Sequence, residues 1–183
     1  MSKPRVIMDA DSIKRAVARV AQQIVEFNGS ANDLVIVGLH THGVFLAQRL
    51  ASLINQAEGT HVPVGTMDIT LYRDDIGVRE SGPHLPVRQG TDIPFDISEK
   101  IVVLVDDVLH TGRSTRAALD QLMDLGRPKK IQLVGLIDRG GRELPIRPDF
   151  VGRELTVADD ELVRVHLVEL DDADEVVIEP RRR

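Results

Sequence analysis

Two hydrophobic patterns alternate along the chain. In the first, apolar side chains recur every three to four positions, which predicts amphipathic helices. These segments are 9–29, with Asp9 or Asp11 as its cap, 44–54 and 114–125. In the second, short runs rich in Val, Ile and Leu predict buried strands. These runs are 34–39, 62–71, 101–105, 131–137, 163–168 and 176–178.

The order of these segments predicts the fold class. Alternating strands and helices favour an α/β fold with a central, mostly parallel, twisted sheet and helices on both faces. In such sheets the ligand lies beyond the carboxyl ends of the strands, so three loops are expected to converge there: 40–43, 106–115 and 138–142. The long polar segment 73–91 is expected to be a flexible loop that acts as a lid.

The stretch from Lys100 to Leu122 carries the most specific chemistry. A predicted strand leads into Asp106 and Asp107, and a hydroxyl-rich loop, Thr111 to Thr115, leads into a predicted helix. Backbone N–H groups at a helix N-terminus favour an anion, and the carboxylates in front of it can reach sugar hydroxyls. We therefore predict a ribose with its 5′-phosphate in the loop. The plainer alternative is a turn with two solvated aspartates and a Thr/Ser helix cap.

Composition narrows the range of functions. The chain has 183 residues, 42% of them hydrophobic and 28% charged, which is typical of one globular domain. Four Phe, one Tyr and no Trp argue against nucleic-acid recognition by base stacking. The net charge of −6 argues against a globally basic nucleic-acid binder and leaves room for a local basic face.

The chain also lacks the signals of other classes. Without cysteine there are no disulfides and no thiolate metal ligands, which is compatible with a cytoplasmic location. No apolar run has membrane-spanning length, so no membrane association is expected. Neither a P-loop nor a dinucleotide fingerprint occurs in the sequence.

Three motifs resemble known families. Val102 to Ser114 resembles the thirteen-residue phosphoribosyl pyrophosphate (PRPP) signature of type I phosphoribosyltransferases. LYRDD at 71–75 and DRGGRELPIR at 138–147 resemble bifunctional pyrimidine operon regulators that double as uracil phosphoribosyltransferases. The resemblance implies a single phosphoribosyltransferase domain over 1–183, with a small C-terminal hood at about 139–180. It also implies a homodimer or higher homo-oligomer.

The same resemblance implies an enzyme that converts uracil and PRPP to UMP and pyrophosphate, with Mg²⁺ bound through PRPP and not directly by the protein. Asp106 and Asp107 would orient the ribose, and Arg73 would close over pyrophosphate. The substrate-binding residues that it implies are Thr41, His42, Gly43, Arg88, Val108, Leu109, His110, Thr111, Gly112, Arg113, Ser114, Thr115, Asp138, Arg139 and Val163.

Two histidines depart from the family pattern. His42 stands where Arg is usual, and His110 stands where these regulators generally have Tyr. Histidine is only partly cationic near neutrality and cannot form the bidentate fork of Arg. We therefore expect weaker PRPP binding that strengthens as the pH falls and the His42 imidazole becomes charged. A role for His110 in binding the base and a role in packing both remain open.

The family's second activity is binding of an RNA stem-loop in the leader of a pyrimidine biosynthesis transcript, in response to UMP. Arg19, Arg142, Arg147 and Arg153 match the basic face that would bind it. Three polar family contacts are replaced, at Ala18, Gln22 and Gly141. Two alternatives stay open: a UMP-sensing RNA-binding regulator with little catalysis, and a type I phosphoribosyltransferase for another base.

Overall fold

The computed structural model describes residues 4–70 and 90–181. Its helices are α1 (Ala10–Asn28), α2 (His42–Glu58) and α3 (Arg113–Leu125). The strands of its larger sheet are β2 (Leu34–Leu39), β3 (Val64–Met67), β4 (Ile101–Leu109), β5 (Lys130–Asp138) and β6 (Phe150–Glu154). They lie in the order β3-β2-β4-β5-β6, and every neighbouring pair is parallel. The predicted α/β fold with a parallel central sheet is confirmed.

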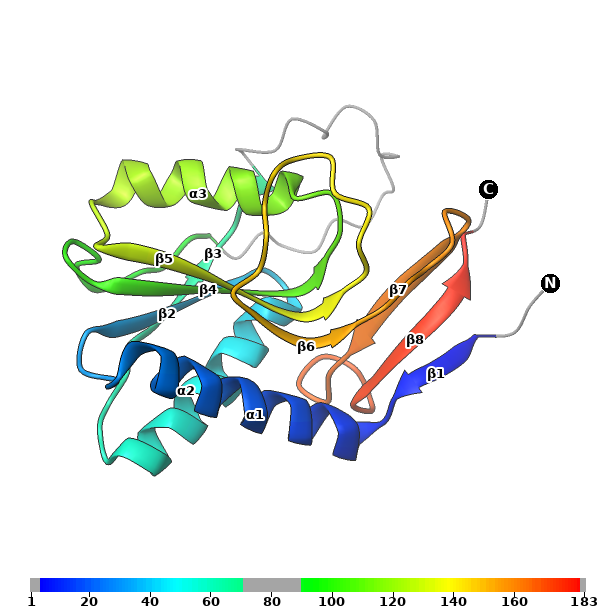
Figure 1. Ribbon diagram of the computed structural model, residues 1–183, viewed down its shortest axis with the longest axis horizontal. Helices are drawn as coiled ribbons and strands as arrows, with labels where there is room; N and C mark the ends of the chain where they lie inside the picture. The colour runs from blue at the N-terminus through cyan, green and yellow to red at the C-terminus, as the bar shows by residue number, and fades with distance from the viewer. Residues whose placement is uncertain (1–3, 71–89, 182–183) are drawn as a thin grey trace.

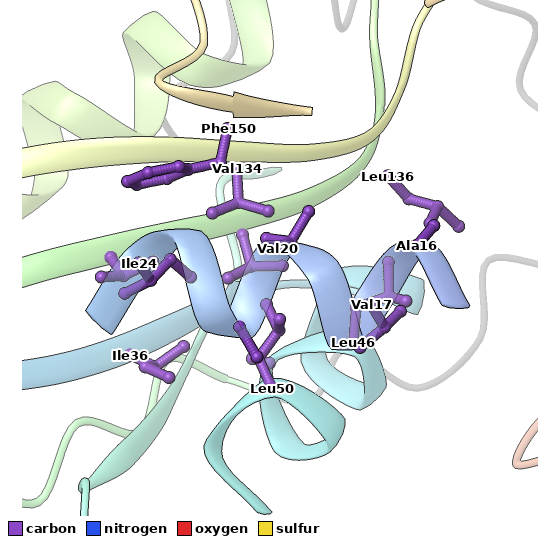
Figure 2. Close-up of a cluster of buried hydrophobic side chains, with 14 of the residues drawn as sticks. Ala16, Val17, Val20, Ile24, Ile36, Leu46, Leu50, Val134, Leu136 and Phe150 are labelled. Atoms are coloured by element: carbon purple, nitrogen blue, oxygen red, sulfur yellow. The ribbon is translucent and has the colours of Figure 1, made fainter. Parts of the chain in front are cut away.

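The helices cover both faces of this sheet, as predicted. Figure 1 shows α1 and α2 on one face and α3 on the other. Side chains alternate along β4, so Val103 and Val105 join the core under α1 and α2, while Val102 and Leu104 join the core under α3. Figure 2 shows the first of these cores, where side chains of α1 and α2 meet those of the sheet.

The first helix follows its sequence pattern. The Asp9 carboxylate caps it by accepting a hydrogen bond from the Ser12 N–H at 2.8 Å, and Gly29 ends it in the left-handed region at φ 73°. Its buried residues are Ile13, Ala16, Val17, Val20, Ala21 and Ile24. Phe27, predicted on the same stripe, is 63% exposed, and its ring makes an edge contact with Phe150.

Several boundaries differ from the prediction. Strand β4 continues through the acidic pair to Leu109 because β5 pairs with it as far as Asp138. Helix α2 begins at His42, two residues earlier than predicted. Strand β6, where no strand is predicted from the sequence, pairs with β5. These shifts place more of the site on regular structure than the sequence indicates.

A second, antiparallel sheet stands beside the first (Figure 1). It contains β1 (Arg5–Met8), β8 (Glu175–Pro180) and β7 (Glu161–His166), in that order. The two late strands were predicted, but β1 was not. Residues Val165, Leu167 and Val176 of this region are buried in the core under α1 and α2, which fixes the small sheet to the large one. Among the described residues, no helix is both long and apolar enough to cross a membrane.

Candidate active site

The predicted convergence of loops occurs at the carboxyl ends of β4 and β5. Leu109 pairs with Asp138 at the last position of the two strands. Beyond it, the Arg139 N–H donates to the Leu109 carbonyl at 3.1 Å. The N–H groups of Glu143 and Leu144 both donate to the Thr111 carbonyl, at 2.9 and 3.2 Å. The loop after β4 and the loop after β5 are thus held together by their backbones.

The two carboxylates stand at the open end of β4. Asp106 and Asp107 are both partly exposed. The Asp106 Oδ1 accepts from the Asp107 N–H, and the Asp107 Oδ1 accepts from the Val108 N–H, each at 2.9 Å. These bonds orient the carboxylates. Carboxylate oxygens accept hydrogen bonds from hydroxyl groups, so a pair at this position is suited to a sugar.

The segment 111–115 leads directly into α3. Gly112 precedes the helix at φ 90°, a conformation that favours glycine, and the Arg113 N–H donates to Thr111 Oγ1 at 3.3 Å. The first N–H groups of a helix have no intrahelical partner, so this end can bind an anion. Thr111, Arg113 and Ser114 are partly exposed there, whereas Gly112 and Thr115 are buried. A phosphate would therefore meet the first three most directly.

The turn after β2 lies in close contact with β4. Thr41 is exposed, and the peptide bond between His40 and Thr41 is cis. Gly43 is buried, and a Cβ added there would lie 2.5 Å from the Val105 carbonyl oxygen. Only glycine allows α2 to start so close to the strand that carries Asp106.

His42 lies between two carboxylates. Its Nδ1 is 3.6 Å from Asp107 Oδ2, and its Nε2 is 3.2 Å from Asp171 Oδ2. Burial raises the pKa of Asp171, but hydrogen bonds from the Leu167 N–H and from His42 and His166 outweigh it and hold that pKa below its ordinary value. The residue predicted to contact pyrophosphate therefore also contacts the turn between β7 and β8.

The predicted base-binding residues lie beside the same loops. Asp138 Oδ1 accepts from the Gly140 N–H at 2.9 Å, and its Oδ2 accepts from Arg142 at 2.7 Å. The Arg139 guanidinium donates to the Glu161 carbonyl at 3.2 Å and so is directed towards β7. Val163, on β7, is partly buried and packs against the core under α1 and α2. The backbone of 138 and 139 thus lies against the end of β4, while both side chains bond within the protein.

The four arginines predicted for RNA binding differ in their surroundings. Arg19 donates to the Gly152 carbonyl, and Arg153 donates to the Ile7 carbonyl at 2.6 Å. Arg147 is exposed and lines a groove of about 620 Å³ whose lining also includes Glu26, Asp149 and Glu154. Arg142 is directed inward and bonds to three segments of the site.

Two predicted site residues, Arg73 and Arg88, lie outside the described residues. Conversely, sequence reasoning missed Asp171, His166 and Arg49. Asp171 belongs to an acidic run at 169–175, a pattern typical of a solvated surface. Nothing in the spacing of this run indicates that Asp171 contacts His42 at the start of α2. Within residues 4–70 and 90–181, no group of three or more His, Asp or Glu side chains could hold a metal ion alone.

A family model and curated relatives match nearly the whole chain. The model of the phosphoribosyl transferase domain matches residues 7–170. A "Bifunctional protein PyrR" of Chloroflexus aurantiacus is 56% identical over 97% of this chain and 96% of its own length. Another, of Alkaliphilus metalliredigens, is 53% identical over 98% of this chain and 97% of its own.

Solved structures agree on the fold. The hypoxanthine phosphoribosyltransferase of Trypanosoma cruzi has a TM-score of 0.72 at 15% identity, with 97% of each chain covered. A hypoxanthine phosphoribosyltransferase of Staphylococcus aureus has a TM-score of 0.68 at 20% identity, covering 94% of this chain and 90% of its own. The pair of carboxylates, the anion loop and these likenesses lead to one conclusion: the chain belongs to the phosphoribosyl transferase domain family and, within it, to the bifunctional PyrR proteins.

Proposed function

We propose that this protein transfers the phosphoribosyl group of PRPP to uracil, giving UMP and pyrophosphate. One observation carries the proposal: Asp106 and Asp107 end β4 directly before the N-terminus of α3, and His42 at the start of α2 lies 3.6 Å from Asp107. This arrangement offers a hydroxyl-binding carboxylate pair between two helix starts, each suited to a phosphate group.

Each part of PRPP has a counterpart in the site. The carboxylates orient the ribose hydroxyls, and residues 111–115 bind the 5′-phosphate. The turn 41–43 receives pyrophosphate, together with Arg73 and Arg88 from the segment 71–89. Positive and N–H groups at the leaving group stabilise the charge that develops on pyrophosphate as its bond to ribose C1 breaks and the bond from C1 to the base forms. Positioning and electrostatics carry the catalysis, and no covalent nucleophile is required.

Mg²⁺ fits this site as a companion of PRPP. Mg²⁺ is commonly bound through substrate phosphates with few protein ligands, and the described residues contain no cluster that would hold it alone. When bound, it neutralises charge on the pyrophosphate oxygens. The protein's part is to fix the ribose and the 5′-phosphate, so that the reacting carbon faces the base.

Uracil is proposed as the base because the curated relatives at 53–56% identity are bifunctional PyrR proteins, and DRGGRELPIR belongs to the same pattern. Asp138, Arg139 and Val163 would form the base side of the pocket, largely through backbone groups of the first two. The residues from about 139 to 180, which include β7 and β8, would form the hood of a single domain spanning 1–183.

We propose regulation of a pyrimidine operon through leader RNA as the second activity. The exposed Arg147 and the basic side chains around β6 supply the phosphate contacts, which account for most nucleic-acid affinity. A cytoplasmic homodimer or higher homo-oligomer is the state in which we expect both activities.

The carboxylate pair provides the test of catalysis. In the variant with Asp106→Asn and Asp107→Asn, we expect kcat/KM for UMP formation to fall at least about a hundredfold, because ribose orientation is lost. Asp159→Asn with Asp160→Asn is the matched control, since these two adjacent aspartates are exposed. Circular dichroism checks that both variants fold. An unchanged kcat/KM in the site variant would refute the assignment.

The competing function is a UMP-sensing regulator with little transfer activity, for which the same pocket would be an effector site. Assays of nucleotide formation with uracil and with purine bases separate it from the enzyme. Binding of a leader stem-loop, measured with and without UMP over a series of salt concentrations, tests the RNA activity. A salt slope near zero would argue against RNA as a partner.

A further inference from the structure

Arg142 occupies a central place in the loop that follows β5. Its guanidinium donates three hydrogen bonds: from Nε to the Ile146 carbonyl at 2.9 Å, from Nη1 to the His110 carbonyl at 2.6 Å, and from Nη2 to Asp138 Oδ2 at 2.7 Å. Its side chain is 21% exposed, and that of Asp138 is 17% exposed. This arginine is therefore held inside the loop after β5 and is not a freely projecting surface cation.

The three acceptors come from three different segments. The His110 carbonyl follows the end of β4 and directly precedes the phosphate-binding residues 111–115. Asp138 ends β5 on the side where the base is proposed to bind. Ile146 belongs to the far end of the loop, and its side chain lies beside Gly112, because a Cβ added to Gly112 would be 3.4 Å from Ile146 Cβ. One guanidinium thus joins the phosphate loop, the base side and the loop between them.

We infer that Arg142 is a positioning residue that holds the PRPP loop and the base side of the pocket in one fixed arrangement. This inference rests on the proposed function for the identity of the two substrates. A planar guanidinium presents donors in several fixed directions, which a lysine ammonium or a glutamine amide cannot reproduce. Loss of the arginine leaves the His110 and Ile146 carbonyls without their donor and allows the two loops to move apart.

The positioning role and a direct contact with RNA would both use the N–H donors of the Arg142 guanidinium. A phosphate contact needs outward N–H groups, but three of the five guanidinium N–H groups, one on each nitrogen, already donate inside the protein. The partly buried pair with Asp138 also opposes withdrawal of the side chain, because Asp138 would lose its charged partner. Arg147, five residues later, is exposed.

The two roles predict different measurements on Arg142→Gln. If Arg142 positions the pocket, KM for PRPP and KM for uracil should both rise about tenfold while kcat changes less than about twofold, because substrates must then reorder both loops. Leader-RNA affinity and its salt slope should stay unchanged. Arg142→Lys, which can reach fewer of the acceptors, should show an intermediate rise in both KM values.

Arg127→Gln is the matched control, since Arg127 is exposed in the turn before β5, at the opposite end of the sheet. Its KM values should equal those of the unsubstituted protein. The inference is overturned if Arg142→Gln leaves both KM values unchanged while the RNA salt slope falls by about one, the mark of a lost phosphate contact. It is equally overturned if only the melting temperature falls and the folded variant keeps both KM values.

Failure of the proposed function would appear separately. In that case the unsubstituted protein would form no UMP from uracil and PRPP. Calorimetric binding of PRPP and UMP would then replace the KM values: a loss of about tenfold in both affinities for Arg142→Gln supports the positioning role. Unchanged affinities would refute it.

Discussion

At the residue scale, two glycines determine how closely the site is assembled. A Cβ at Gly38 would lie 2.5 Å from the Gly43 carbonyl oxygen, and a Cβ at Gly43 would lie 2.5 Å from the Val105 carbonyl oxygen. The start of α2 is therefore in direct backbone contact with both β2 and β4. This contact brings His42 within reach of Asp107.

Gly43→Ala tests that contact. The obstacle is a backbone carbonyl and not the end of a flexible side chain, so α2 must move away from β4. We expect a loss of about 1–3 kcal/mol in the free energy of unfolding, typical of overpacking, together with a higher KM for PRPP. Urea unfolding and steady-state kinetics measure the two effects. Gly59→Ala, where the added Cβ meets nothing within 4 Å but φ is 63°, controls for backbone strain without a clash and should leave KM unchanged.

At the scale of elements, α2 connects the site to the small sheet. Through His42 it contacts Asp107 on β4 and Asp171 in the turn between β7 and β8, and His166 on β7 lies 3.4 Å from the same Asp171. Because the Asp171 pKa is lowered, this carboxylate is ionised throughout the neutral range, so a pH effect there would come from an imidazole.

Asp171→Asn tests the contact between Asp171 and His42. In the unsubstituted protein, KM for PRPP should fall as the pH decreases from 8.5 to about 6, because the charged imidazole attracts pyrophosphate. Without the contact to Asp171 at 3.2 Å, the His42 ring is held less firmly at the start of α2, so KM for PRPP at pH 6 should rise in the variant. Asp172→Asn removes a neighbouring exposed charge and should leave KM for PRPP unchanged at every pH. A KM that is flat over this range in the unsubstituted protein would contradict the proposed role of His42.

Also at this scale, the regular elements could be predicted where their periodicity is long or strongly apolar. Helix α1 and strands β2, β4 and β5 show such patterns, and the acids and hydroxyls after β4 indicated the site. Strand β1 was missed because only Met8 among its four residues is buried. Strand β6 was missed because Gly152, Arg153 and Glu154 give it the composition of a loop.

Side-chain partners were not predictable from the sequence. His42 and Asp171 are 129 residues apart, and they meet only because the turn between β7 and β8 packs beside α2. Arg142 lies in a segment whose composition is that of a surface loop. Its inward direction follows from where the ends of β4 and β5 lie. Local pattern determines the elements, whereas such contacts depend on how the two sheets are assembled.

At the scale of the whole molecule, a second contact fixes the small sheet to α2. Arg49 makes a two-bond fork with Glu169, at 2.8 and 2.6 Å, and another with Asp174, at 2.7 and 2.8 Å. Hydrogen bonding from Arg49 lowers the pKa of both carboxylates. A carboxylate with a lowered pKa in the folded state stabilises the fold above its ordinary pKa, and this stabilisation disappears as the pH falls through the folded value.

Arg49→Gln tests this contribution of the two carboxylates to the free energy of unfolding. At pH 7 we expect the variant to lose about 1–3 kcal/mol of unfolding free energy, less than for a fully buried pair because the side chains are partly solvated. The difference from the unsubstituted protein should shrink as the pH falls below about 4, the ordinary carboxylate pKa, because the folded carboxylates become protonated only at lower pH. Urea unfolding at several pH values measures it. Arg164→Gln removes an exposed arginine paired with Glu179 on the same small sheet, and it should cost less than about 0.5 kcal/mol at any pH. Equal losses in the two variants would show that the Arg49 contact does not hold the sheets together.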